Sequence, residues 1–433
     1  MSDAASRPDA KTPTGGTGEG GAFLDMFRDV PVPDRCVACT NCSLACPVTR
    51  VAPDYMGPRM MGPVYERFRR GEVPPTSRKA LKLALHEDPF LHYCSNCKNC
   101  DIACPCGVPI SSLIMEARAS FPRSRLTALR DWILAHGETI GLRTALFPAA
   151  LRNFAMNLSP TRHVLAALGV AFKAPLPAFA SATFNGFLGS LPQPEGLVRK
   201  VAVFPGCYVN LYDHDCGKDL VYLLNRAGYR VVPSGFVCCG LPMIANGFAG
   251  DARANAETNM AELARLENDG VPVLAPCPSC VMTLNEDRPA ACKDAGPPPV
   301  IDACAFVAGC IARGELALPS ANPMRVMYHA PCHLRAQGIG LPGLDLLSDV
   351  PGLDVLEAGA GCCGISGSYG FKKEKYALAM SIGEELFGRV KESGAGLVVT
   401  ECGTCRVQIA HGTGKAVRHP LSLLRSLFAD VVR

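Results

Sequence analysis

The sequence predicts a multidomain α+β protein, with a helical, cysteine-rich N-terminal domain followed by two tandem α/β repeats. Two observations support this prediction. A four-cysteine run occurs twice in the first quarter of the chain, beginning at Cys36 and at Cys94. In the second half, a pattern built around Cys-Cys-Gly also occurs twice, at 238–240 and at 362–364. Self-similarity at one fixed offset indicates two copies of one fold unit.

Composition limits the classes of function. With 433 residues and 48% hydrophobic composition, the chain can bury a sizeable core and form two or three domains. A net charge of only +4 gives no reason to expect a nucleic-acid partner. The chain has 23 cysteines but begins without an apolar export signal, so we expect reduced, metal-binding thiols rather than disulfides. The sequence contains no run of about 18 strongly apolar residues, so we expect no transmembrane helix.

We expect five segments along the chain. Residues 1–21 are rich in Gly, Thr, Ser and Asp and are expected to form a disordered tail. Residues 22–120 hold both four-cysteine runs and form the helical N-terminal domain. Residues 121–196 form a basic amphipathic helical connector. The two Cys-Cys-Gly repeats then occupy residues 197–320 and 321–433.

Both runs in the N-terminal domain have the spacing C-x2-C-x2-C-x3-C-P, from Cys36 to Cys46 and from Cys94 to Cys104. In such a run the first three thiolates bind one 4Fe–4S cluster, whereas the fourth binds the other cluster. Two 4Fe–4S clusters are therefore expected. Their ligands are Cys36, Cys39, Cys42 and Cys104 for the first cluster, and Cys94, Cys97, Cys100 and Cys46 for the second.

Structural zinc is the alternative for any two cysteines that are separated by two residues. Two matched runs, each followed by a proline, favour a two-cluster electron-transfer domain. The 47 residues between Cys46 and Cys94 are too many for a minimal ferredoxin hairpin, so we expect a mostly helical ferredoxin domain. Cys106, just after the second run, is interpreted as a spare buried thiol.

The connector has an excess of positive charge and apolar residues at helical spacing. It can pack against the rest of the protein as helices with a proline-rich linker. Alternatively, it can lie with a basic amphipathic face on an anionic membrane. Both interpretations stay open. Between residues 121 and 180, the acidic residues are Asp131 and Glu138, and the basic residues are Arg123, Arg125, Arg130, Arg143, Arg152, Arg162 and Lys173.

Each repeat alternates expected strands with expected helices, which predicts a parallel sheet. The five cysteines of each repeat fall at strand ends or in the loops after them, where open α/β sheets bind their ligands. Gly240 and Gly364, which follow the paired cysteines, allow a positive φ or a close approach of the backbone. The first set is Cys207, Cys238, Cys239, Cys277 and Cys280, and the second is Cys332, Cys362, Cys363, Cys402 and Cys405.

Because both copies keep all five thiols, we expect one or two further iron–sulfur clusters in the repeats. Adjacent cysteines point in divergent directions, which suits a cluster better than a single tetrahedral ion. The alternative is that one copy holds zinc or no metal, its cysteines being inherited from the duplication.

The combined pattern resembles a family of iron–sulfur electron-transfer subunits. This family includes the D subunit of heterodisulfide reductase and the iron–sulfur subunits of glycolate and lactate oxidation. Within it, the chain is most similar to the C subunits of anaerobic glycerol-3-phosphate dehydrogenases, over about residues 33–424. The sequences that carry this likeness are Cys-Pro-Val at 46–48, Pro63 with Glu66 and Arg67, and residues 206–210, 217–220, 238–247, 362–374 and 397–402.

The resemblance implies a relay for anaerobic respiration. A flavin-containing dehydrogenase subunit would oxidise glycerol 3-phosphate, and this chain would pass the electrons through 4Fe–4S clusters to quinone. It also implies a peripheral position on the cytoplasmic face of the inner membrane. No catalytic residue is then expected on this chain. The alternatives are a catalytic subunit that reduces a disulfide at its Cys-Cys-Gly cluster, and a glycolate or lactate oxidase subunit. A substrate cleft beside that cluster would favour the disulfide reductase.

Several weaker signals are set aside. The Gly-x-Gly-x-x-Gly matches at 16–21 and 359–364 lack the context of a nucleotide fingerprint, so no FAD or NAD site is expected. His329 and His333 flank Cys332, and we favour solvated or packed histidines over metal ligands. Lys372 and Lys373 either stabilise a reduced cluster or begin an exposed helix. The thiols without a counterpart in the other repeat are interpreted as structural, namely Cys216, Cys292, Cys304 and Cys310.

Overall fold

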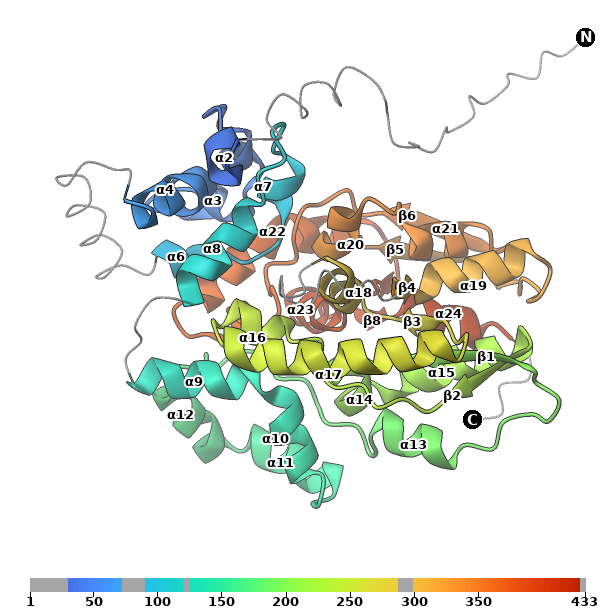
Figure 1. Cartoon of the computed structure of the whole chain (residues 1–433). Coiled ribbons are helices and arrows are strands. Elements are labelled where there is room, and N and C mark those ends of the chain that lie inside the picture. Colours follow the sequence, from blue (N-terminus) through green and yellow to red (C-terminus); the bar gives the residue numbers. More distant parts are fainter. Residues whose placement is uncertain (1–29, 72–89, 120–124, 287–298, 429–433) are drawn as a thin grey trace, which may run out of the picture.

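The computed structural model describes residues 30–71, 90–119, 125–286 and 299–428 (Figure 1). The expected tail at residues 1–21 and Cys292 lie outside these ranges. In the described part, a helical N-terminal domain, a helical connector and two α/β repeats follow one another, as the sequence predicts. Within that part, none of the helices is both long and apolar enough to cross a lipid bilayer.

The N-terminal domain consists of short helices in its described residues, which gather at one end of the molecule beside α22 (Figure 1). Met61, Ile110 and Ile114 form the centre of its apolar core together with several of the cysteines. The helices are η1 (Val32–Arg35), α2 (Asn41–Ala45), α3 (Pro47–Val51), η2 (Met60–Val64), α4 (Tyr65–Arg69), α6 (Phe90–Tyr93), α7 (Asn99–Ile102) and α8 (Ile110–Ala119).

The connector is helical and is fixed to the second repeat by a buried ion-pair network. Asp131 lies 2.9 Å from Arg130 and 3.0 Å from Lys372, and Arg130 also pairs with Glu374. Burial alone would raise the pKa of Asp131, but these two cations hold it below its usual value. Lys372 therefore serves this docking contact. The connector helices are α9 (Arg125–Ala135), α10 (Gly137–Thr144), α11 (Ala149–Asn157), α12 (Ser159–Ala167) and α13 (Phe184–Ser190).

The first repeat contains a parallel sheet in the order β2–β1–β3–β4. Its strands are β1 (Arg199–Val203), β2 (Tyr229–Val232), β3 (Val273–Ala275) and β4 (Ile301–Asp302). Its helices are α14 (Gly206–Leu211), α15 (His214–Arg226), α16 (Leu241–Ala245), α17 (Ala249–Asn268), α18 (Pro278–Asn285) and α19 (Ala303–Ala312).

The second repeat has the same topology, with a parallel sheet in the order β6–β5–β7–β8. Its strands are β5 (Met324–Tyr328), β6 (Leu353–Glu357), β7 (Leu397–Val399) and β8 (Ala416–Arg418). Its helices are α20 (Cys332–Gln337), α21 (Pro342–Ser348), η4 (Tyr369–Phe371), α22 (Tyr376–Glu392), α23 (Gly403–Thr413) and α24 (Pro420–Ser426).

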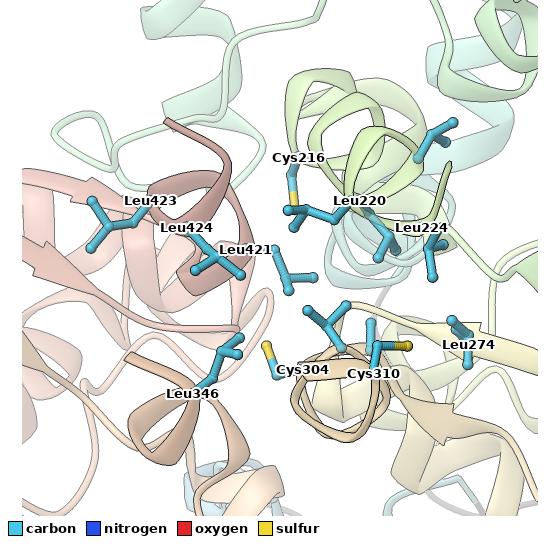
Figure 2. Packing of buried hydrophobic residues seen from close by; sticks show 14 of the residues in the cluster. Cys216, Leu220, Leu224, Leu274, Cys304, Cys310, Leu346, Leu421, Leu423 and Leu424 are labelled. Carbon is cyan, nitrogen blue, oxygen red and sulfur yellow. The ribbon is translucent and has the colours of Figure 1, made fainter. Parts of the chain in front are cut away.

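The two repeats share one large apolar core. Helix α15 of the first repeat packs on α24 of the second, and α19 of the first packs on α21 of the second. Figure 2 shows leucines from both repeats meeting there around Cys216, Cys304 and Cys310. These three cysteines are almost fully buried and belong to this apolar core, which agrees with their interpretation as structural thiols. The core fixes the position of one sheet relative to the other.

The glycine of each Cys-Cys-Gly sequence adopts the left-handed backbone conformation, with φ of +87° at Gly240 and +88° at Gly364. At Gly364 the carbonyl oxygen of Ala379 occupies the space that a Cβ atom would need. Gly367 has a φ of +63° but nothing near its Cβ position, so it offers a matched comparison.

Replacing Gly364 by alanine should therefore destabilise the protein more than replacing Gly367. Gly367→Ala should cost about 1–2 kcal/mol for the left-handed conformation alone. Gly364→Ala should cost about 1–3 kcal/mol more because the backbone of α22 must move. Denaturant unfolding under anaerobic conditions measures both. Equal midpoints for the two variants would contradict the close approach seen at Gly364.

Candidate iron–sulfur sites and the cavity between the repeats

The two four-cysteine runs have the same unusual backbone. Ala38 and Thr40 have φ of +59° and +66°, and Asn96 and Lys98, at the equivalent positions of the second run, have +55° and +64°. Such a conformation costs a residue other than glycine about 1–2 kcal/mol. Strain of this kind persists where the surrounding structure requires it, most often at functional sites. The sequence carried no signal for it, because no glycine marks these positions.

The first group of thiols combines both runs. Cys36, Cys39, Cys42 and Cys104 line one small cavity, and Cys106 lies in its wall. Burial raises the pKa of Cys42, and the neighbouring thiols of Cys36 and Cys104 raise it further. The structure thus brings together the four cysteines assigned to the first cluster. Cys106 is buried, as expected for a spare thiol. It nevertheless lines the same cavity as the four assigned cysteines.

The second group consists of Cys94, Cys97 and Cys100 with Cys46, all of which are buried. Burial raises the pKa of Cys46 to about 11, with a contribution from Cys94. Arg118 is buried beside this group and donates a hydrogen bond of 2.7 Å to the carbonyl oxygen of Cys94. A buried cation at this position would favour a negatively charged cluster.

In each repeat the five predicted cysteines form an unbroken chain of neighbouring thiols. In the second repeat, the Sγ atoms of Cys363 and Cys405 are 3.2 Å apart. The order in the first repeat is Cys207, Cys238, Cys239, Cys280 and Cys277. The order in the second repeat is Cys332, Cys362, Cys363, Cys405 and Cys402.

These donor sets fit an iron–sulfur cluster. Hydrogen bonds from neighbouring thiols, together with burial, raise the pKa of Cys238 and Cys280 well above its usual value. Several sulfurs crowded in a dry site can ionise together only when a metal cation compensates their charge. Thiolates select zinc, copper(I) or iron–sulfur groups. Five neighbouring thiols exceed the four ligands of a structural zinc ion, so a polynuclear group fits better.

The two repeats face one apolar cavity of about 140 Å³. Cysteines of both repeats line it, as do Ser95 and Asn96 from the loop of the second N-terminal group. His333 links the three walls, because its Nδ1 lies 2.9 Å from Ser279 Oγ and its Nε2 lies 2.7 Å from the Asn96 carbonyl oxygen. His333 is thus a packed histidine, as expected. The shared cavity was not predicted from the sequence.

The two repeats differ in the groups beside their thiols. In the first repeat, the carboxylate of Glu138 accepts a 2.7 Å hydrogen bond from the backbone N–H of Cys238. In the second repeat, His329 is buried against Cys363 and Cys405. Burial lowers the pKa of His329 to about 4, so the ring is neutral at neutral pH. His329 is therefore not solvated, and its place beside two thiols supports the ligand role that the sequence analysis ranked second.

A larger cavity, of about 670 Å³, lies between α15 and α24. Charged side chains line it, among them Asp213 and Arg406, which pair with each other at 2.6 Å. None of the predicted cluster cysteines lines it, whereas nine of them line the smaller cavity between the repeats.

Comparison with protein families agrees with this arrangement. Residues 33–108 match the family described as 4Fe-4S dicluster domain. Residues 201–285 and 326–410 each match the family described as Cysteine-rich domain. The two matches to the latter cover the two repeats separately, in line with the duplication.

Similar proteins come from several organisms. The chain is 38% identical over 403 residues to the C subunit of anaerobic glycerol-3-phosphate dehydrogenase from Escherichia coli strain K12, covering 92% of this chain and 98% of that protein. It is 27% identical to the B subunit of the CoM/CoB fumarate reductase from Methanothermobacter marburgensis, over 93% of this chain and 74% of that protein. It is also 27% identical to lactate utilization protein A of Bacillus subtilis, over 50% of this chain and 92% of that protein. The chain therefore belongs to the iron–sulfur family that contains the C subunits of anaerobic glycerol-3-phosphate dehydrogenases.

Proposed function

We propose that this chain is the electron-transfer subunit of a flavin-dependent glycerol-3-phosphate dehydrogenase complex. It takes electrons from the flavin-containing partner and delivers them to quinone at the membrane surface. Family membership supports the substrate and the partner. The observation that supports the relay itself is the contact between the second N-terminal thiol group and the second repeat.

Cys97 and Cys362 belong to one cluster of buried side chains, and helices α7 and α20 pack against each other. Burial raises the pKa of Cys97, and the largest further contribution comes from Cys362 of the second repeat. The thiol of Cys97 in turn raises the pKa of Cys332. The corresponding cysteines of the first repeat lie across the shared cavity. The groups are thus arranged in series: first N-terminal cluster, second N-terminal cluster, second repeat and then first repeat.

The first N-terminal cluster is the proposed entry for electrons, because its surroundings are open. Cys39 is exposed. Leu44 on α2 and Ile102 on α7 are 78% and 54% exposed, and each lies eight residues after the first cysteine of its run. Val37, which lines the cavity of this group, is also exposed, and helices α2 and α7 pack against each other. A surface of this kind suits the docking of the flavin-containing subunit.

The apolar rim of the cavity between the repeats is the proposed exit, because nine of the ten repeat cysteines line this cavity and the proposed clusters would fill much of it. Leu241, Pro242 and Ile365 give it apolar walls beside both sets of paired cysteines. Binding sites for small organic molecules combine apolar walls with a few polar groups, here from Ser279 and His333. The head group of a quinone has this character.

The connector is the proposed membrane surface, although not through the basic face that was one of the two interpretations left open by the sequence. Arg130 forms an ion pair with Glu374 of the second repeat. Arg152 and Arg162 donate hydrogen bonds to backbone carbonyl oxygens within the connector, so these three cations do not form a free basic face. Instead, large apolar side chains are exposed, with Leu146 at 89% and Phe154 at 65%. The exposed apolar residues of the connector, which we call the apolar patch, are Leu129, Leu142, Leu146, Phe147, Leu151, Phe154, Leu158, Val164 and Phe172.

These residues lie on α9–α12 and the loops between them and after α12, across the molecule from α2 and α7 (Figure 1). Exposed basic residues, Arg143 and Lys173, accompany them. Peripheral membrane proteins typically insert apolar side chains into the membrane–water interface and keep a few cations near the lipid head groups.

A second candidate function is the reduction of an organic disulfide in the shared cavity. A cleft beside the Cys-Cys-Gly thiols is the feature that would favour it, and the cavity has this position. The reaction would consume two electrons and two protons and yield two thiols. Under this alternative the apolar patch on the connector would have no part in turnover.

Loss of the paired cysteines should separate these functions. In the assembled complex, Cys238→Ser/Cys239→Ser and Cys362→Ser/Cys363→Ser should leave reduction of an artificial acceptor by the flavin partner unchanged. Quinone reduction should fall at least 100-fold in one or both, since a relay cannot bypass a missing carrier. Turnover with an organic disulfide in place of quinone would instead support the second candidate. Wild-type quinone reduction in both variants, with the N-terminal clusters intact, would show that the repeats are scaffolding.

The crossed assignment of the N-terminal ligands can be tested with four single variants and EPR. Anaerobic protein should contain about eight irons for two 4Fe–4S clusters, besides any iron in the repeats. Cys104→Ser should alter the same cluster signal as Cys36→Ser, and Cys46→Ser the same signal as Cys97→Ser. Cys106→Ser is the matched control and should leave both signals unchanged. The opposite pairing of signals would refute crossed ligation, and stoichiometric zinc without iron would refute the clusters.

Membrane binding should depend on the apolar patch more than on charge. Phe147→Ser/Phe154→Ser should lower binding to anionic vesicles at least 10-fold. Complete transfer of one phenylalanine side chain out of water contributes about 1.5–3 kcal/mol of favourable free energy, which the variant loses at each position. Ile339→Ser removes another exposed apolar residue, 48% exposed on the loop between α20 and α21, and should have no effect. Vesicle co-sedimentation measures binding. If the double variant binds as well as wild type, the connector serves only packing.

A further inference from the structure

The duplication provides an internal comparison for His329. It follows β5 directly, as Phe204 follows β1, and the two positions differ by 125 residues. The backbone N–H of His329 donates to the carbonyl oxygen of Val399 at 2.9 Å, and that of Phe204 donates to Leu274 at 2.7 Å. Val399 and Leu274 also differ by 125 residues. The two side chains therefore occupy the same place in the two copies.

Both side chains lie against equivalent thiols. Phe204 belongs to an apolar cluster that includes Cys239 and Cys280. In the second repeat, a ring nitrogen of His329 and the Sγ atoms of Cys363 and Cys405 all lie within 4.8 Å of one another. The fold thus accepts an apolar ring at this position in one copy, so packing alone does not require an imidazole in the other.

The polar atoms of His329 have no partner of their own among the described residues. The residue is 1% exposed, and neither Nδ1 nor Nε2 makes a hydrogen bond. Leaving a buried polar group without a hydrogen bond costs about 1–3 kcal/mol. A nitrogen that faces two thiols in a dry site has the position of a metal ligand, since imidazole and thiolate bind the same soft and borderline metals.

We propose that His329 supplies a nitrogen ligand to the iron–sulfur group of the second repeat, whereas the first repeat holds its group by thiolates alone. The inference rests on the proposed function only in that both repeats hold iron–sulfur groups. Histidine in the place of a cysteine thiolate raises the reduction potential of an iron–sulfur centre, because the neutral imidazole brings no negative charge to the iron. Glu138 beside Cys238 acts in the opposite direction on the first repeat. The two groups are therefore unequal carriers, with the higher potential in the second repeat.

The test uses full-length, anaerobically reconstituted protein that carries ¹⁵N-labelled histidine. Pulsed EPR should detect a strongly coupled nitrogen in the reduced wild type, and His329→Phe should abolish this coupling. The variant copies the residue of the first repeat, so it should keep its iron, and one midpoint potential should shift to a more negative value. Phe204→His is the reciprocal variant and should leave the original coupling in place.

The measurement on labelled wild type remains decisive even where a variant loses its cluster. Absence of nitrogen coupling in iron-loaded wild type, or an equal coupling in His329→Phe, would overturn the ligand. A weak coupling typical of a hydrogen bond would also overturn it. Zinc in the second repeat, detected by X-ray absorption, would overturn the iron assignment. None of these outcomes concerns the quinone assay with the paired-cysteine variants, so failure of the relay and failure of this ligand can be told apart.

Discussion

Crowding of thiols in dry sites is the constraint on which the rest of this structure depends. Neighbouring thiols and burial raise the pKa of Cys280 in the first repeat and of Cys405 in the second, so these two sulfurs are poor ligands until a metal replaces their protons. Holding them together requires strained loops at Ala38 and Asn96 and left-handed glycines after the paired cysteines. The sheets, the shared core and the connector supply the packing that maintains these conformations.

The way in which the repeats pack explains why their thiols meet. Each copy places its cysteines at the carboxyl end of a parallel sheet, as the fold class requires. Helix α15 packs on α24, and α19 packs on α21, so the last helix of each copy meets an earlier helix of the other copy. This reciprocal contact sets the two sheets so that both thiol groups border one cavity. A single repeat would present its thiols to solvent.

Local patterns and periodicity accounted for much of the fold and for the grouping of the candidate site residues. The run from Cys36 to Cys46 and the 125-residue offset are visible in the chain itself, and they predicted the helical domain and the two parallel sheets. Contacts between distant segments left no such trace. The approach of Cys97 to Cys362, the pairing of Arg130 with Glu374 and the cavity between the repeats depend on tertiary packing. The connector shows the difference most clearly, because counting its basic residues could not reveal which were paired.

With His329 as the proposed ligand, the duplication would let one fold unit hold two different carriers. If the two copies differed in nothing else, two groups held by five thiols each would have similar reduction potentials. Moving an electron from one group to the other would then release little free energy. Residues next to the thiols differ between the two copies. The second repeat has His329 where the first has Phe204, and Glu138 lies beside the first repeat. They come from the end of a strand and from the connector, so they can vary without disturbing the cysteine ligands. A difference in potential across the shared cavity would favour an acceptor bound between the two groups, in contact with both, over one that meets either group alone.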